Sequence, residues 1–312
     1  MTAQYRGRFA PSPTGPLHFG SLVAAVGSYL QARSHDGAWL VRIENLDPPR
    51  ESPTASDQIL STLEYFGLCW DEDVLYQSDR YSAYEAALDR LREHELLFYC
   101  TCSRKDLRDA QPKSPADSGS EPVYPGTCRW RRTAPPQPHS VRILTSAAPI
   151  VFEDALQGQC EQIVEQVSGD FVLKRRDGLY SYQLAVVVDD AAQGISEVVR
   201  GADLLGQTAR QIFLQKKLDL PMPAYAHLPI VIDNAGNKLS KQTGAVDVRS
   251  GTGYTPLWHA LNFLRQDPPP ELYRASAAEM LEWAVPHWKI EHLAGELRRT
   301  LHSINENPSY DV

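Results

Sequence analysis

A loop close to the N-terminus combines residue types that suit phosphate binding. Residues 8–21 read Arg-Phe-Ala-Pro-Ser-Pro-Thr-Gly-Pro-Leu-His-Phe-Gly-Ser, and the apolar stretch Ser21–Ala32 that follows has helical spacing. The loop therefore brings His18, the small Gly20 and the Ser21 hydroxyl to a helix N-terminus, where free N–H groups and the helix dipole favour phosphate. Taken alone, the pattern fits an ordinary loop with a capping serine better.

A second motif, Lys238-Leu-Ser-Lys-Gln242, follows about 220 residues later, after the strand-like stretch Ile230–Ile232. Its two lysines flank a serine in a glycine-containing loop, where they can neutralise the charge that builds on a triphosphate during attack at the α-phosphorus. On its own, this motif could be any exposed basic loop.

Three of the five cysteines, Cys100, Cys102 and Cys128, lie close together in the chain. The CxC spacing suits a metal site in a reducing compartment better than a disulfide framework. Tetrahedral zinc needs four donors, so the cysteines leave one position open, and a reduced, metal-free trio is the alternative. Cys69 and Cys160 are expected to be buried free thiols.

The composition is that of an ordinary globular protein. The 312 residues are 42% hydrophobic and 22% charged, enough for about two domains. No stretch approaches the roughly 20 apolar residues of a membrane span, and the polar N-terminus holds no apolar signal segment, so we expect a cytoplasmic protein. The net charge of −8 argues against broad, sequence-indifferent nucleic-acid binding. Residues 129–132 and 174–176 could still form a local basic patch, although such clusters are more often a solvated face.

The order of apolar segments favours an α/β fold with a parallel sheet. The helix-like Ser21–Ala32 precedes a strand-like Trp39–Ile43, and an amphipathic stretch, Leu204–Leu218, lies between the strand-like Ala185–Val188 and Leu228–Ile232. A segment rich in Pro, Ser and Gly separates these two halves. We therefore expect one nucleotide-binding fold split by an insertion, followed by a helical tail that includes Leu257–Leu264. The expected division of the chain is 1–98, 99–190, 191–243 and 244–312.

Four motifs, in the same order, resemble those of class I aminoacyl-tRNA synthetases of the glutamyl-tRNA synthetase type. They are the loop 8–21, Arg42-Ile-Glu-Asn-Leu-Asp47, Val199-Arg-Gly-Ala-Asp203 and Lys238-Leu-Ser-Lys241. The first and last correspond to the HIGH and KMSKS signatures, with Ser21 in place of the second histidine and Gln242 in place of the final serine. The resemblance implies a class I synthetase fold, a Rossmann-type parallel sheet split by an inserted zinc-containing subdomain, with a small C-terminal helical subdomain.

The resemblance also assigns residues to the site. His18, Lys238 and Lys241 are expected to be catalytic through electrostatic stabilisation. The residues expected to bind ATP are Arg8, Phe9, Ala10, Pro11, Ser12, His18, Gly20, Ser21 and Lys241. Glutamate has two carboxylates and one ammonium, so its pocket needs cations, one anion and hydroxyl donors. The residues expected to bind it are Arg8, Ser12, Glu44, Tyr182 and Arg200. The resemblance assigns Tyr124 as the fourth ligand of one structural zinc, beside the three cysteines.

The activity that the resemblance implies is activation of glutamate by ATP with Mg²⁺, followed by transfer to RNA. Only 71 residues follow Lys241, too few for an anticodon-binding region. We therefore expect the branch of the family that transfers glutamate to the queuosine base of tRNA(Asp), in a monomer that activates glutamate without tRNA. The alternatives are a truncated synthetase that charges a tRNA 3′ end, and a non-catalytic nucleotide- or RNA-binding paralogue, which would be expected to have lost His18 or Lys241.

Overall fold

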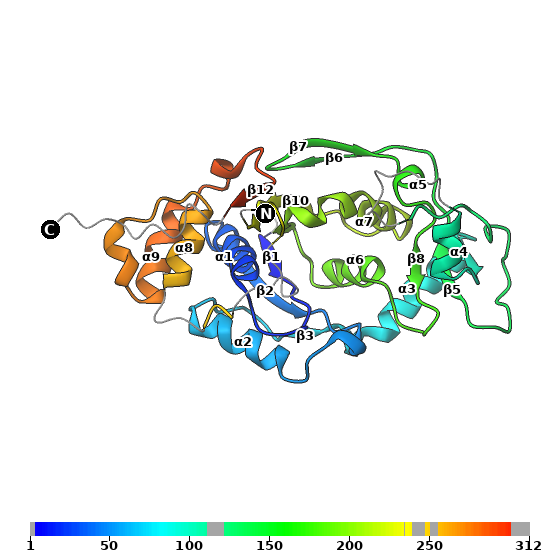
Figure 1. The fold of residues 1–312 in the computed structure, drawn as a ribbon, viewed down its shortest axis with the longest axis horizontal. Helices are drawn as coiled ribbons and strands as arrows, with labels where there is room; N and C mark the ends of the chain where they lie inside the picture. The colour runs from blue at the N-terminus through cyan, green and yellow to red at the C-terminus, as the bar shows by residue number, and fades with distance from the viewer. Residues whose placement is uncertain (1–3, 111–121, 234, 239–246, 250–254, 301–312) are drawn as a thin grey trace.

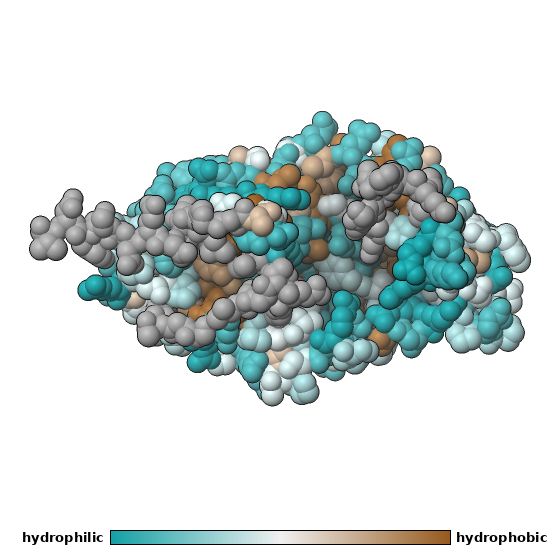
Figure 2. Space-filling view, viewed as in Figure 1, coloured by the Kyte–Doolittle hydropathy of each residue, from teal (hydrophilic) through white to brown (hydrophobic). Residues whose placement is uncertain are grey.

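The computed structural model describes residues 4–110, 122–233, 235–238, 247–249 and 255–300. Lys241 and Gln242 lie outside these ranges, as does most of the linker before Tyr124. The molecule is elongated (Figure 1), with the N-terminal strands near its middle, helices α8 (Thr255–Phe263) and α9 (Ala277–His287) towards one end and α4 (Arg104–Asp109) towards the other. Figure 2 shows hydrophobic residues gathered near the middle of one face, between largely hydrophilic flanks.

The first half of the nucleotide-binding fold is a parallel βαβ unit. Strands β1 (Arg6–Phe9) and β2 (Ala38–Ile43) pair in parallel and are connected by α1 (Phe19–Arg33), and β2 also pairs with β3 (Leu75–Tyr76). Helix α1 is held by apolar residues one turn apart, since Leu22, Val26 and Leu30 are fully buried. The predicted helix at 21–32 and strand at 39–43 are confirmed.

The second half repeats the pattern. Strands β9 (Glu197–Gly201) and β10 (Ala224–Leu228) pair in parallel around α7 (Leu205–Lys217), which confirms the predicted helix at 204–218. The predicted strand at 228–232 is divided at Pro229: β10 ends before it, and β11 (Ile230–Ile232) pairs instead with β12 (Arg298–Thr300). Proline has no N–H to donate, so it interrupts the ladder where the chain changes sheets.

The strand predicted at Ala185–Val188 is wrong. These residues lie in helix α6 (Tyr182–Ala192), whose first turn is capped by the Ser181 side chain, which accepts a hydrogen bond from the Leu184 N–H. The apolar run is buried because α6 packs against both α3 (Tyr81–Glu93) and α7. A short run of β-branched residues that is buried on several sides has the same composition in a helix as in a central strand, so tertiary packing decides between them.

The region between the two halves contributes its own sheet. Strands β4 (Leu97–Cys100), β5 (Ser140–Ile143) and β8 (Val172–Lys174) form an antiparallel sheet. The hairpin of β6 (Ile150–Asp154) and β7 (Gly158–Gln162) extends back instead, and β6 pairs in parallel with β10. Helix α5 (Val164–Val167) also lies in this region, whereas α2 (Ala55–Tyr65) precedes it, between β2 and β3. The four sequence ranges given for the domains stay predictions.

Helices α8 and α9 pack against α1 and close the core at that end (Figure 1). The predicted helix at 257–264 is confirmed by α8, which ends one residue earlier, at Phe263. None of the described helices has the length and apolar character needed to cross a lipid bilayer.

Candidate active site

A cavity of about 610 Å³ opens at the carboxyl ends of β1 and β9, in front of the N-terminus of α1. This edge of a parallel sheet, facing a helix N-terminus, is where α/β folds bind phosphate-containing ligands. Of the residues that the sequence assigns to nucleotide binding or catalysis, those lining the cavity are Phe9, Ala10, Pro11, Ser12, His18, Gly20, Ser21 and Lys238. The prediction for Lys241 falls on a residue outside the described part of the chain.

His18 is the N-cap residue of α1, directly before the helix. Its backbone is extended at the N-cap, its Nδ1 lies 3.3 Å from the Ser21 N–H that it accepts from, and its Nε2 lies 3.1 Å from the Ser21 hydroxyl. The first turn of α1 holds no acidic residue, so no carboxylate of the helix itself offsets the positive end of its dipole. The imidazole is thus fixed at the point where a phosphate would meet the helix.

Both flanks of the 239–246 segment lie at this cavity. On one side, Lys238 lines it, and its ammonium lies 2.5 Å from the Asp203 carboxylate. On the other side, Asp247 pairs with His18 in an isolated β-bridge, and the Val248 N–H donates to the Leu17 carbonyl. The basic motif and the N-terminal loop, distant in sequence, therefore meet in the fold.

A buried polar cluster adjoins the cavity and contains four of the five residues predicted to bind glutamate, whereas the fifth, Ser12, lines the cavity itself. Arg200 Nη1 donates to the Tyr182 hydroxyl over 3.3 Å. Burial raises the pKa of Tyr182, while the charges of Arg200, Glu44 and Arg8 are close enough to act on the same hydroxyl. The structure therefore brings Arg8, Glu44, Tyr182 and Arg200 together.

Arg8 does not line the nucleotide cavity. The residue is 3% exposed, and its Nε pairs with Asp190 at 3.1 Å, so Arg8 belongs to the buried polar cluster and not to the lining of the cavity. Arg42 pairs with the same Asp190 oxygen at 2.7 Å and with Glu44 at 3.4 Å. Burial raises the pKa of Glu44 above its usual range, although both arginines oppose the shift.

Sequence reasoning missed several ionisable residues of this cluster, namely Arg42, Asp154, Asp190 and His227. Asp190 is held ionised despite burial, because Arg42 and Arg8 keep its pKa below the usual range. Asp190 directly follows the apolar run for which the sequence predicts a strand. The run is instead part of helix α6, and this places Asp190 on a buried face of the helix, where it meets Arg8 and Arg42. Asp154 and His227 carry no local motif, since only strand pairing brings them together.

The three cysteines form a cluster that could hold a metal. Their sulfur atoms all lie within 4.8 Å of one another, with Cys102 and Cys128 3.7 Å apart. Burial and the neighbouring Cys100 raise the pKa of Cys102 to about 12, as expected for thiols that would repel one another as thiolates without a cation. Three thiol donors at this spacing fit a tetrahedral zinc site that needs one further ligand. The hydroxyl of Tyr124 lies at the same cluster, within 2.8 Å of the Cys128 backbone nitrogen.

The two other cysteines lie outside this cluster. Cys69 is exposed and Cys160 is half-buried, so the expectation of buried thiols is wrong for both.

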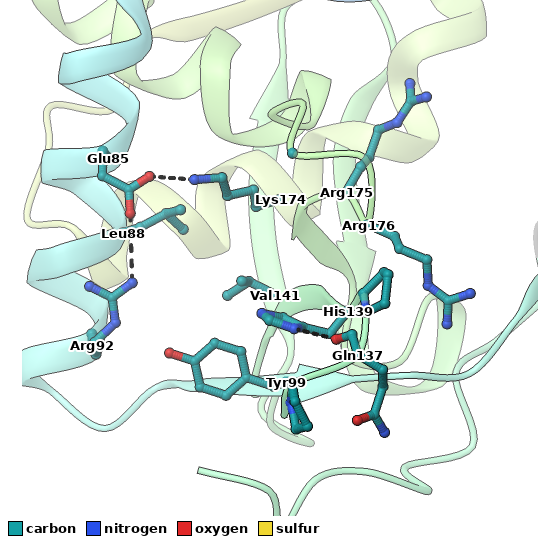
Figure 3. A pocket seen from close by; sticks show the side chains of 13 residues that line it. Glu85, Leu88, Arg92, Tyr99, Gln137, His139, Val141, Lys174, Arg175 and Arg176 are labelled. Atoms are coloured by element: carbon teal, nitrogen blue, oxygen red, sulfur yellow. Dashed lines mark hydrogen bonds and ion pairs between the residues drawn. The ribbon is translucent and has the colours of Figure 1, made fainter. Parts of the chain in front are cut away.

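A second cavity, of about 520 Å³, lies between α3, β4 and the turn after β8 (Figure 3). Its charged lining consists of Glu85, Arg92, Lys174, Arg175 and Arg176, with Tyr99 and His139 beside them. The first two cations of the 174–176 cluster are neutralised, because Lys174 pairs with Glu85 at 2.7 Å and Arg175 pairs with Asp47 and Asp177. Among the described residues, Arg176 forms no such ion pair and donates to the Thr101 carbonyl.

The loop that carries Cys128 lies at the edge of the same cavity region. Arg131 donates to the Thr101 hydroxyl over 2.9 Å, so its guanidinium and that of Arg176 converge on one residue. Trp130 is 73% exposed, and the Arg131 guanidinium carbon lies 5.3 Å from its ring centroid. Arg129 differs, because it pairs with Glu165 and Asp170 and supports the loop. We call Trp130, Arg131 and Arg176 the basic edge.

A parallel α/β fold with a phosphate-type cavity and a buried charged cluster is typical of a nucleotide-dependent enzyme, and its three cysteines could hold a metal. The family described as "tRNA synthetases class I (E and Q), catalytic domain" matches residues 4–265, and the chain therefore belongs to this family.

Proteins named glutamyl-Q tRNA(Asp) synthetase are similar over nearly the whole chain. The one from Dechloromonas aromatica (strain RCB) is 53% identical over 291 residues, which cover 93% of this chain and 96% of that protein. The one from Serratia proteamaculans (strain 568) is 46% identical over 306 residues, 98% of this chain and 96% of that protein.

Solved structures agree on the fold. A glutamate tRNA ligase from Elizabethkingia meningosepticum CCUG26117, in complex with its amino acid, matches with a TM-score of 0.75 at 24% identity. The match covers 94% of this chain and 66% of that one. At this identity the likeness concerns the fold alone.

Proposed function

We propose that the protein activates L-glutamate with ATP and transfers it to the queuosine base of tRNA(Asp). The observation that carries the proposal is near-full-length identity of 46–53% to proteins named for that activity. Two features of the structure support it. The cavity at the N-terminus of α1 suits a triphosphate, and the adjoining cluster of Arg200, Tyr182 and Glu44 suits a dicarboxylic amino acid.

The reaction has two steps, and neither needs a protein nucleophile. A carboxylate oxygen of glutamate attacks the α-phosphorus of ATP, pyrophosphate leaves, and a mixed anhydride forms; an RNA hydroxyl then attacks the acyl carbon and releases AMP. His18, Lys238 and Lys241 would stabilise the charge on the phosphates, and Arg200 and Tyr182 would hold the amino acid. The buried carboxylate of Glu44 would bind its ammonium group. Mg²⁺ would enter with ATP and neutralise phosphate charge.

The cysteine cluster would hold one structural zinc with Tyr124 as fourth ligand. Its distance in the fold from the nucleotide cavity supports a structural role, since catalytic zinc keeps an open position beside the substrate. Reduced thiols and cytosolic substrates favour a cytoplasmic location, and we expect the protein to act as a monomer.

RNA would approach the inserted region through the basic edge. An exposed indole offers a face on which an unstacked base can lie, and two neighbouring guanidinium groups suit phosphates. A local basic site of this kind is compatible with the overall net charge of −8, because contact is confined to one edge.

One transfer assay tests the proposed function. Labelled glutamate and ATP are supplied with tRNA(Asp) that carries either queuosine or guanosine at the same position, each prepared with a normal 3′ end and with a 2′,3′-dideoxy 3′ end. We expect transfer to both queuosine forms and to neither guanosine form. Transfer that needs the 3′ hydroxyls and ignores queuosine would show that the protein charges a tRNA terminus instead.

A further inference from the structure

A chain of hydrogen bonds crosses three neighbouring strands behind Arg200. Asp154 ends β6, His227 lies on β10 and Arg200 on β9, and the parallel register places His227 opposite Arg200. Asp154 Oδ2 lies 2.5 Å from His227 Nδ1, and His227 Nε2 lies 3.0 Å from Arg200 Nε. The exposed fractions of the three residues are 1%, 0% and 5%, so water does not compete for these bonds.

The partners fix where the imidazole proton lies. An arginine Nε–H can only donate, so His227 Nε2 must accept, and Nδ1 must carry the proton and donate it to the Asp154 carboxylate. Burial keeps the pKa of His227 below its usual range, and the charges of Arg200 and Arg8 act in the same direction, against the carboxylate. The neutral ring is therefore held in a single tautomer.

The Asp154 carboxylate is itself held in place. Its Oδ1 accepts from the backbone N–H groups of Leu156 and Gln157, in the turn between β6 and β7, over 3.1 and 3.0 Å, and from that of His227 on β10 over 3.2 Å. Asp154, which anchors the chain of hydrogen bonds, thus belongs to a hairpin of the inserted region, whereas Arg200 belongs to the second half of the nucleotide-binding fold.

The remaining nitrogens of Arg200 are divided between two sides. Nη2 donates to the Thr208 hydroxyl over 2.9 Å, and Nη1 faces the Tyr182 hydroxyl. We propose that Asp154 and His227 are positioning residues that orient the Arg200 guanidinium so that Nη1 faces the glutamate pocket. The proposal rests on the proposed function, in which Arg200 binds a glutamate carboxylate.

Asp154→Asn tests the proposal with almost no change of shape. The amide oxygen would keep the backbone N–H groups, so the amide nitrogen would face His227 and donate to Nδ1. The imidazole proton would then move to Nε2 and oppose the Arg200 Nε–H, leaving two donors face to face. We expect the KM for glutamate in pyrophosphate exchange to rise about 10- to 100-fold, the range for losing a hydrogen bond to a charged group. The KM for ATP should change by less than about twofold.

A matched pair at position 227 separates positioning from simple support of the fold. In His227→Gln the amide oxygen can replace Nε2 as the acceptor for Arg200, whereas in His227→Asn the amide nitrogen can replace Nδ1 as the partner of Asp154. Positioning of Arg200 predicts that the glutamine variant keeps the lower KM for glutamate. A role confined to satisfying Asp154 predicts the reverse order.

The outcomes distinguish this proposal from the proposed function. If the wild-type protein shows no glutamate-dependent exchange, the proposed function fails. If the wild type is active and Asp154→Asn, folded as judged by its thermal midpoint, keeps the wild-type KM for glutamate, or if the order at position 227 is reversed, the positioning role is wrong.

Discussion

The hydroxyl oxygen of Tyr124 accepts a hydrogen bond of 2.8 Å from the backbone N–H of Cys128. The ring is buried against Phe98, and the Arg142 guanidinium carbon lies 4.1 Å from its centroid, so the phenol oxygen is fixed beside the three sulfur atoms. Burial and hydrogen bonding to the thiol of Cys100 raise the pKa of Tyr124, so a phenolate there requires a nearby cation.

We predict that Tyr124→Phe, which removes only this oxygen, weakens zinc binding by at least about tenfold, as measured by competition with a chromophoric chelator. The purified wild type should contain one zinc per chain, and Cys128→Ala should lose it. Cys160→Ala is the control, because that thiol lies outside the cluster and its loss should leave the zinc content unchanged. Less than half a zinc per wild-type chain, with no further loss in Cys128→Ala, would rule out the site.

We predict that the Asp190 carboxylate makes a large contribution to the free energy of unfolding, because it pairs with two buried arginines. Asp190→Asn leaves the Arg8 guanidinium without its counter-charge and leaves Arg42 with only its 3.4 Å contact to Glu44, so it should destabilise the fold by about 3–5 kcal/mol at pH 7. The measurement is urea unfolding, with Glu72→Gln as control, because the Glu72 side chain is 54% exposed and its pair with Arg6 should contribute less than about 1 kcal/mol.

The effect of Asp190 should depend on pH with a defined sign. Its pKa is lowered in the folded state, so its contribution is fully present above the pKa of the unfolded chain, near 3.9, and is lost as the pH falls through the folded value. The difference in unfolding free energy between wild type and Asp190→Asn should therefore shrink below about pH 4. A difference that stays constant into that range would mean that Asp190 is not ionised in the fold.

The first βαβ unit could be predicted from the sequence because its pattern is local. Helix α1 buries residues one turn apart and follows a glycine-punctuated loop, and β2 is a short β-branched run. Helix α6 could not be predicted in the same way, because its valines are buried between two other helices and the periodicity of a fully buried segment carries little information.

The same distinction applies to the site. The nucleotide cavity is formed by continuous motifs, and the sequence identified eight of the residues that line it. Asp154, Asp190 and His227 belong to no motif, and each acquires its partner only through pairing of distant strands or packing of a helix. A single sequence shows local spacing but not which buried acid will meet which buried base.

Glutamate binding is predicted to weaken in acid through Glu44. Burial raises the pKa of this carboxyl, so it takes up a proton at a higher pH than an ordinary glutamate and then no longer attracts the substrate ammonium group. The KM for glutamate should rise as the pH falls through this raised pKa, by up to about tenfold for each unit below it, while the KM for ATP stays nearly flat. Glu44→Gln should have a high KM that no longer varies over the same range. An equal pH dependence in both proteins would assign the titration to another group.

The arginines of the basic edge are predicted to bind RNA phosphates. If Arg131 and Arg176 each neutralise one phosphate, the double variant Arg131→Ala/Arg176→Ala should lower kcat/KM for tRNA by about 10- to 100-fold at physiological salt. It should also reduce the slope of log affinity against log salt by roughly 1.4–1.8, as expected for two phosphate contacts. Pyrophosphate exchange without RNA should be unchanged, because neither residue lines the nucleotide cavity.

Trp130 separates stacking from charge. Trp130→Ala should lower transfer to tRNA by about 5- to 100-fold, the range for removing one aromatic platform beneath a base, whereas Trp130→Phe should keep most of it. Neither variant should alter the salt slope, because the indole is uncharged. Lys216→Ala is the charge control, since this lysine is exposed near the end of α7 and its loss should affect transfer by less than about twofold. If the double arginine variant keeps the wild-type salt slope, or if both tryptophan variants transfer as well as wild type, RNA binds another face of the protein. If exchange without RNA falls in parallel with transfer, the edge supports the fold rather than the RNA.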